Sequence, residues 1–125
     1  LHGRTLDLDS AYRQLFVSMT SRWASVIATF NPKLGRPELD IIEALPFGAT
    51  AAVHGFNRFA RCLWFVGVAC FDLLWCNYFD DFPQLDLVSC EQDALEAAER
   101  FLKLVGWSVS NKESKRAPFH RLSRP

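Results

Sequence analysis

The chain has 125 residues, and its 14 Lys and Arg residues balance 14 Asp and Glu residues, so the formal net charge is zero. Half of the residues are apolar, which supports one compact core and excludes a disordered chain. A free-standing nucleic-acid binder usually carries a basic excess, so such a partner would have to be held by local patches or by other parts of a larger protein. No secretory signal is visible. The sequence begins with Leu inside a predicted strand, and we expect a fragment of a longer protein.

The first part of the chain predicts a strand, a short helix and a hairpin. Residues 4–9 alternate in the manner of a strand, and residues 10–16 follow as a brief helix. Two runs of strand-forming residues then flank the turn cluster "NPKLGRP". Together they predict a β-hairpin over residues 23–45.

The middle of the chain predicts a long helix and a second hairpin. Apolar residues recur at helical spacing from 50 to about 66. Gly67 predicts a break there, before a buried strand over residues 70–78. Residues 82–88 are expected to return as the partner strand, where Pro83 suits an edge position.

The last part predicts the clearest helix of the chain and a basic tail. Ser89 and Gln92 have the spacing of a capping box, and Gly106 stands at the expected stop. A short strand over 107–110 and a basic tail over 111–125 follow. The order of elements predicts an α+β fold with helices on one face of a mainly antiparallel sheet.

Two features bear on the compartment. The run "CLWFVGVACFDLLWCNYF" approaches the length of a membrane span, but Asp72 within it would be costly in lipid, so we expect no membrane partner. The cysteines lack C-x-x-C spacing and are interpreted as buried free thiols in an intracellular reducing compartment, cytoplasm or nucleus. The four tryptophans are expected in the core. The residues concerned are Cys62, Cys70, Cys76, Cys90, Trp23, Trp64, Trp75 and Trp107.

The stretch "NYFDDF" places two adjacent carboxylates, Asp80 and Asp81, at the tip of the second predicted hairpin. A solvated turn would account for them, and so would a divalent metal ion. Asp7 precedes the end of the first predicted strand, with Asp9 on the same face two residues on. Asp7 converges with Asp80 if that strand lies beside residues 70–78. Mg²⁺ keeps waters and phosphate oxygens in its shell, so two or three carboxylates suffice for a site of the kind used in phosphoryl chemistry.

Four segments, in this order and at these spacings, resemble the motifs of one family. They are "LDLDSAYRQL" (6–15), "ALPFGATAAVHGFNRF" (44–59), "YFDD" (78–81) and "LVGWSVSNKESK" (104–115). They resemble the palm of reverse transcriptases, the RNA-directed DNA polymerases of retroelements. "AYRQL" and "PFG" are most similar to the long-terminal-repeat retrotransposon branch.

The resemblance implies a polymerase palm, a ferredoxin-like antiparallel sheet with helices on one face, and a small fingers-type hairpin. It implies transfer of a nucleotide from a dNTP to a primer on an RNA or DNA template, with two Mg²⁺ ions, or Mn²⁺, as cofactors. The fingers, thumb and RNase H domains of a retroelement polyprotein would be the remaining partners. The isolated chain is therefore not expected to polymerise.

The resemblance also implies residue roles. The metal ligands would be Asp7, Asp80, Asp81 and the backbone carbonyl of Leu8. The nucleotide would be bound by Ala11, Tyr12, Phe47 and Gly48, with Tyr12 excluding a ribose 2′-hydroxyl. Primer and template would contact Tyr78, Phe79, Arg58 and Arg61. Lys115, or alternatively Lys112, would be the general acid for pyrophosphate.

Two other hypotheses remain open at this point. The chain could be a decayed or domesticated copy that folds and binds nucleic acid without catalysis. It could also be another enzyme with a palm fold, such as a nucleotide cyclase, although the signature loop of that class is missing from the sequence.

Overall fold

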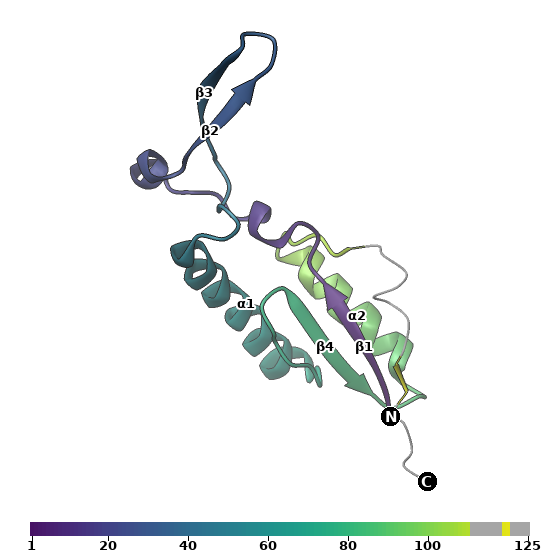
Figure 1. Ribbon diagram of the computed structural model, residues 1–125. Helices are drawn as coiled ribbons and strands as arrows, with labels where there is room; N and C mark the ends of the chain where they lie inside the picture. The colour runs from purple at the N-terminus through teal and green to yellow at the C-terminus, as the bar shows by residue number, and fades with distance from the viewer. Residues whose placement is uncertain (111–118, 121–125) are drawn as a thin grey trace.

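The structure is a computed structural model that describes residues 1–110 and 119–120. It is an α+β fold, as the sequence predicted, with a body of sheet and helices and a hairpin that extends away from this body (Figure 1). Lys112 and Lys115, with most of the predicted basic tail, lie outside the described residues.

The sheet of the body is antiparallel and centred on β1 (His2–Asp7). β4 (Asp81–Asp86) pairs along the whole of β1, and β5 (Phe119–His120) pairs with its beginning, which gives the order β4-β1-β5. β4 is thus an edge strand of this sheet, which is where its Pro83 can be tolerated.

Two α-helices cover the sheet, α1 (Thr50–Phe71) and α2 (Glu91–Leu104). Their buried faces join Leu6 of β1, Leu8 just after β1 and Phe82 of β4 in one hydrophobic cluster. Because alternate residues of a strand point to the same face, both helices contribute to the core on a single face of the sheet. The helical members of the cluster are Ala52, Phe56, Ala60, Leu63, Leu95, Ala98, Phe101 and Leu102.

The predicted break at Gly67 is wrong, because α1 continues through it to Phe71. A side chain at Gly67 would overlap the indole ring of Trp75, so the glycine serves close packing and not a turn. Trp75 donates its indole N–H to the carbonyl of Trp64 (3.1 Å), and Trp64 donates in return to the carbonyl of Trp75 (2.9 Å). The predicted strand over 70–78 is accordingly reduced to isolated bridges to β4.

The two ends of α2 differ from each other in how well the sequence predicted them. The capping box is wrong: the cap position is Cys90, and no side chain caps the helix there. At the other end, Gly106 has a φ of 86°. Its N–H donates to the carbonyl of Lys103 (3.1 Å), and the N–H of Trp107 donates to that of Leu102 (2.8 Å), which is the hydrogen-bond pattern of a Schellman motif.

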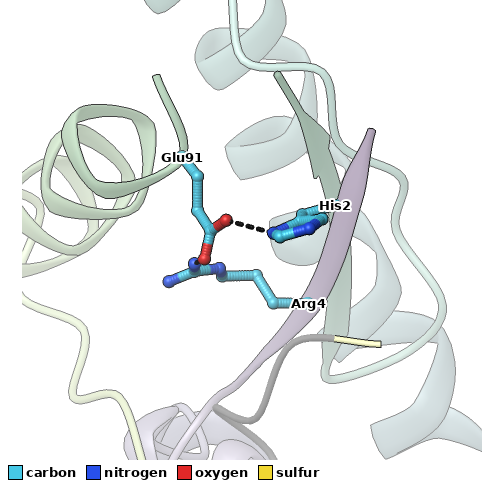
Figure 2. A network of polar contacts seen from close by, with 3 residues as sticks. All are labelled: His2, Arg4 and Glu91. Carbon is cyan, nitrogen blue, oxygen red and sulfur yellow. Dashed lines mark hydrogen bonds and ion pairs between the residues drawn. The ribbon is translucent and has the colours of Figure 1, made fainter. Parts of the chain in front are cut away.

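A polar network fastens the start of α2 to β1 (Figure 2). The Glu91 carboxylate pairs with the guanidinium of Arg4 and, at 2.5 Å, with Nδ1 of His2. The Arg4 side chain is only 9% exposed, whereas in the pair between Arg100 and Glu96 the two side chains are 78% and 53% exposed. Exposed pairs of that kind contribute roughly 0.3–0.5 kcal/mol, while breaking a buried pair costs about 3–5 kcal/mol.

The predicted first hairpin forms from β2 (Val26–Asn31) and β3 (Arg36–Ile41), preceded by a 3-10 helix, η2 (Met19–Ala24). Its register gives the hairpin two chemically distinct faces. One face carries Val26, Ala28, Phe30, Pro37, Leu39 and Ile41, and the other carries Ile27, Thr29, Asn31, Arg36, Glu38 and Asp40. On the second face Thr29 donates to Asp40 (2.7 Å) and Asn31 to Glu38 (2.8 Å).

Several burial predictions are wrong. Trp75 is buried and Trp107 packs against the core, but Trp23 and Trp64 are exposed. All four cysteines are free and exposed rather than buried. Among the described residues, no helix combines the length and the apolar character that crossing a membrane requires.

Candidate active site at the tip of β1 and β4

The register of the sheet brings the predicted metal ligands together. Asp7, the last residue of β1, lies opposite Asp81, the first residue of β4. The next residue, Leu8, donates its backbone N–H to the carbonyl of Asp80 (3.3 Å). Asp7 is buried, whereas Asp80 and Asp81 are half-buried. Two carboxylate-bearing segments that are far apart in the sequence therefore meet at one end of the β1–β4 strand pair.

The turn that carries Asp80 is tight and strained. Tyr78 and Asp81 exchange backbone hydrogen bonds in both directions (2.9 and 3.0 Å), which leaves Phe79 and Asp80 as a two-residue loop. Phe79 has a φ of 53°, a left-handed conformation that costs about 1 kcal/mol or more for a residue with a side chain. Such strain clusters at functional sites, and here it lies directly before Asp80.

A cleft of about 940 Å³ opens beside these carboxylates, and we call it the tip cleft. It is walled by the end of β1, by the short 3-10 helix η1 (Ala11–Gln14), and by the loop that leads from the first hairpin to α1. Its lining includes Asp7, Leu8, Asp9, Ala11, Tyr12, Pro46, Phe47 and Asp80. A volume of this size is in the range of small-molecule sites.

Tyr12 forms a rigid wall of the tip cleft. Its ring stacks on Phe56 (centroids 4.5 Å apart, 21° between planes) and meets Phe47 edge-on (5.5 Å, 85°). Phe56 is fully buried and Tyr12 is 8% exposed, whereas Phe47 is 89% exposed. Burial, with a smaller contribution from the charge of Asp80, raises the pKa of the Tyr12 phenol. The phenol therefore stays neutral at physiological pH.

Gln14 holds the segment that carries these residues, and the sequence argument missed it. Its side-chain amide donates to the carbonyls of Asp9 (2.5 Å) and Ser108 (3.0 Å) and accepts from the N–H of Ser108 (2.8 Å). Beside it, the N–H of Ser110 donates to the carbonyl of Asp7 (2.8 Å). The predicted strand over 107–110 thus appears as a bridge between Leu8 and Val109 with flanking hydrogen bonds.

The remaining predicted site residues lie around the turn, with one exception. A second hollow at the turn is lined by Tyr12, Phe47, Gly48, Tyr78, Phe79, Asp80 and Asp81. Arg61 lines a neighbouring hollow with Tyr78 and Phe79. Arg58 is exposed on α1 and is not among the residues that line these hollows. Gly48 has a φ of 91°, which favours glycine there.

The carboxylates at the turn offer oxygen donors to a metal ion but do not enclose one. Within the described ranges, no three His, Cys, Asp or Glu side chains gather closely enough to hold a metal ion by themselves. Asp7 and Asp80 nevertheless line one cleft, and Mg²⁺ commonly takes one or two carboxylates and fills its octahedron with waters and substrate phosphates. The residues present therefore fit a site that is completed by substrate.

Comparisons with known proteins add no family assignment. No protein-family model matches the chain, and no curated protein matches it. The resemblance to reverse transcriptases therefore depends on the four short motifs alone.

Proposed function

We propose that this chain is the palm of a reverse transcriptase and takes part in RNA-directed DNA synthesis by two-metal nucleotidyl transfer. The observation that carries the proposal is the β1–β4 register, which sets Asp7 opposite Asp81 and joins Leu8 to Asp80. More than seventy positions separate Asp7 and Leu8 from Asp80 and Asp81 in the sequence, yet these residues meet at one end of the sheet. The order of the four motifs supports the same conclusion.

The acidic residues have complementary roles in this proposal. Asp7 and Asp80 face one cleft and bind the two Mg²⁺ ions, with Asp81 and the carbonyl of Leu8 as further oxygen donors. When bound, the ions supply Lewis-acid stabilisation for the attacking primer hydroxyl and the leaving pyrophosphate. The chain itself supplies position, because the strand register fixes the two carboxylate segments before any substrate arrives.

Tyr12 selects the sugar in this proposal. A buried ring stacked on Phe56 cannot move aside, so it excludes a nucleotide that carries an additional 2′-hydroxyl next to it. The mechanism is steric and depends on the ring rather than on the phenol oxygen. Phe47, which is exposed and meets Tyr12 edge-on, covers the nucleotide from the other wall of the cleft.

The test is metal binding by the chain itself. Mn²⁺ broadens NMR signals of nearby amides, and we expect it to broaden those of Leu8, Tyr12 and Asp80 first. Asp7→Asn and Asp80→Asn should each weaken Mn²⁺ affinity by at least about tenfold, as is usual for changes at metal sites. Asp40→Asn, on the polar face of the hairpin, is the matched control and should leave the affinity unchanged.

Each alternative has its own result. If Mn²⁺ broadens none of these amides, or if Asp80→Asn binds it as the parent chain does, the metal site and the polymerase assignment are both wrong. A chain that binds oligonucleotides but no Mn²⁺ at these residues is instead the non-catalytic copy. Circular dichroism of each variant shows whether the fold is retained, since Asp7 is buried.

A further inference from the structure

The tip cleft does not end at the carboxylates. It shares Tyr12 and Asp80 with the hollow at the turn. That hollow shares Tyr78 and Phe79 with the next one, which is lined further by Asn57 of α1. Neighbouring hollows therefore adjoin the same side chains, and they follow one another from the active site alongside α1.

The series of hollows extends past the turn to the middle of α1. The third hollow shares Arg61 and Asn77 with a fourth, of about 550 Å³. The fourth is walled by Trp64 and Phe65 on α1 and by the segment after the helix, including Cys76. We call the path from the turn to these two aromatic residues the α1 groove.

The α1 groove combines exposed aromatic rings with positive charge. Phe79 is 41%, Trp64 37% and Phe65 62% exposed, so the groove offers faces on which planar groups can stack. The mutual hydrogen bonds with Trp75 fix Trp64, and a fixed ring loses little entropy on binding. α1 carries arginines but has no Asp or Glu between its first and last residues.

We propose that the α1 groove binds a single strand of nucleic acid that runs to or from the carboxylates, a proposal that rests on the function proposed above. Arg61 contacts a backbone phosphate, and Trp64 and Phe65 stack on unpaired bases. Stacking with cations beside it is how proteins hold single strands without reading sequence. The acids at the turn repel phosphates, so a divalent ion there should strengthen binding at that end of the groove.

The experiment measures binding of fluorescent single strands of about 12 nucleotides, one of RNA and one of DNA, a length within known single-strand site sizes. We expect Arg61→Gln to weaken binding about tenfold. It should also reduce the slope of log affinity against log salt by about 0.7, the value for one phosphate contact on a single strand. Phe65→Ala should weaken binding about fivefold or more, and the RNA and DNA arms show which strand is held.

Matched controls come from the hairpin. Arg36→Gln removes an exposed arginine and Phe30→Ala an exposed phenylalanine, both from the β2–β3 hairpin. Both variants should leave the affinity and the salt slope unchanged. Equal losses in the groove and hairpin variants would overturn the proposal, as would failure of both strands to bind. Neither of those results bears on Mn²⁺ binding at Asp80, so the proposed function can stand when the groove fails. If single strands bind in an Arg61-dependent way but the chain has no Mn²⁺ site, the groove proposal stands and the polymerase proposal is refuted.

Discussion

The body and the β2–β3 hairpin are both rich in apolar residues, but they use them in opposite ways. Every buried hydrophobic residue of the described chain lies in the body, and none lies between Phe16 and Ala44. On the apolar face of the hairpin, Phe30 is 68% and Leu39 75% exposed. A two-stranded hairpin is marginally stable by itself in water, so the stability of this chain resides in the body.

The difference explains how the site is built. The carboxylates belong to the body, where strand register and a packed core fix them. The cleft beside them is completed by residues at the root of the hairpin, including Ile42 and Ala44. The root is tied to the segment just after η1 by backbone hydrogen bonds from Leu45 to Leu15 (2.9 Å) and from Val17 to Glu43 (2.7 Å). The tip cleft therefore has one wall in the packed body and the other at the root of the hairpin, which has no core of its own.

The largest effect is expected when one phenylalanine is removed from the body and, for comparison, one from the hairpin. Phe82→Ala empties a fully buried site and should lower the free energy of unfolding by about 3–5 kcal/mol. Phe30→Ala removes an exposed ring and should change it by no more than about 0.5 kcal/mol. Urea unfolding followed by circular dichroism measures both. A large loss for Phe30→Ala would mean that the hairpin face is buried in solution and that the two regions are equally structured.

The second test uses two glycines of α1. Gly67→Ala places a methyl group in the Trp75 indole and should cost about 1–3 kcal/mol, the range for overpacking a core. Gly55→Ala meets only the Cδ1 atom of Leu45, at 3.9 Å, and should stabilise by roughly 0.5–1 kcal/mol through helix propensity. The unfolding temperature should fall for Gly67→Ala and rise for Gly55→Ala, relative to the parent chain. A rise in unfolding temperature for both variants would show that Trp75 can move away from α1 without a loss of stability.

The sequence predicted elements best where a single local rule decided them. The hairpin came from its turn cluster, and the stop of α2 came from Gly106, which has the required positive φ. Gly67 misled the prediction because a helix glycine has the same letter whether it ends a helix or admits a neighbouring ring. Only the position of Trp75, eight residues later, decides between the two.

The sequence predicted the carboxylates of the candidate site but not the residues that hold the surrounding segments in place. Asp7, Asp80 and Asp81 stand in recognisable motifs, so their convergence could be expected, but the strand beside β1 is β4 and not the predicted strand over 70–78. Gln14 lies within the segment "AYRQL", but two of its three hydrogen bonds are with Ser108, ninety-four residues away. No local pattern encodes such a contact, because the carbonyls that it joins become neighbours only after the sheet has formed.

The smallest expected effect lies at Tyr12, on the border between the two regions. Burial, and secondarily the charge of Asp80, raises its folded-state pKa above 10.0. The phenol of the unfolded chain then ionises first as the pH rises. The stabilisation from the neutral phenol is therefore fully present below about pH 10 and is lost as the pH rises through the folded-state pKa.

Comparison with Tyr12→Phe isolates this contribution, because the two chains share every other titrating group. The difference in unfolding free energy between the parent chain and Tyr12→Phe should be constant from neutral pH to about pH 10 and should then shift against the parent. Asp80→Asn should shrink that shift, since it removes the charge that opposes ionisation. A difference that does not change with pH would mean that Tyr12 is as solvated as in the unfolded chain. The wall of the tip cleft would then belong with the exposed hairpin and not with the packed body.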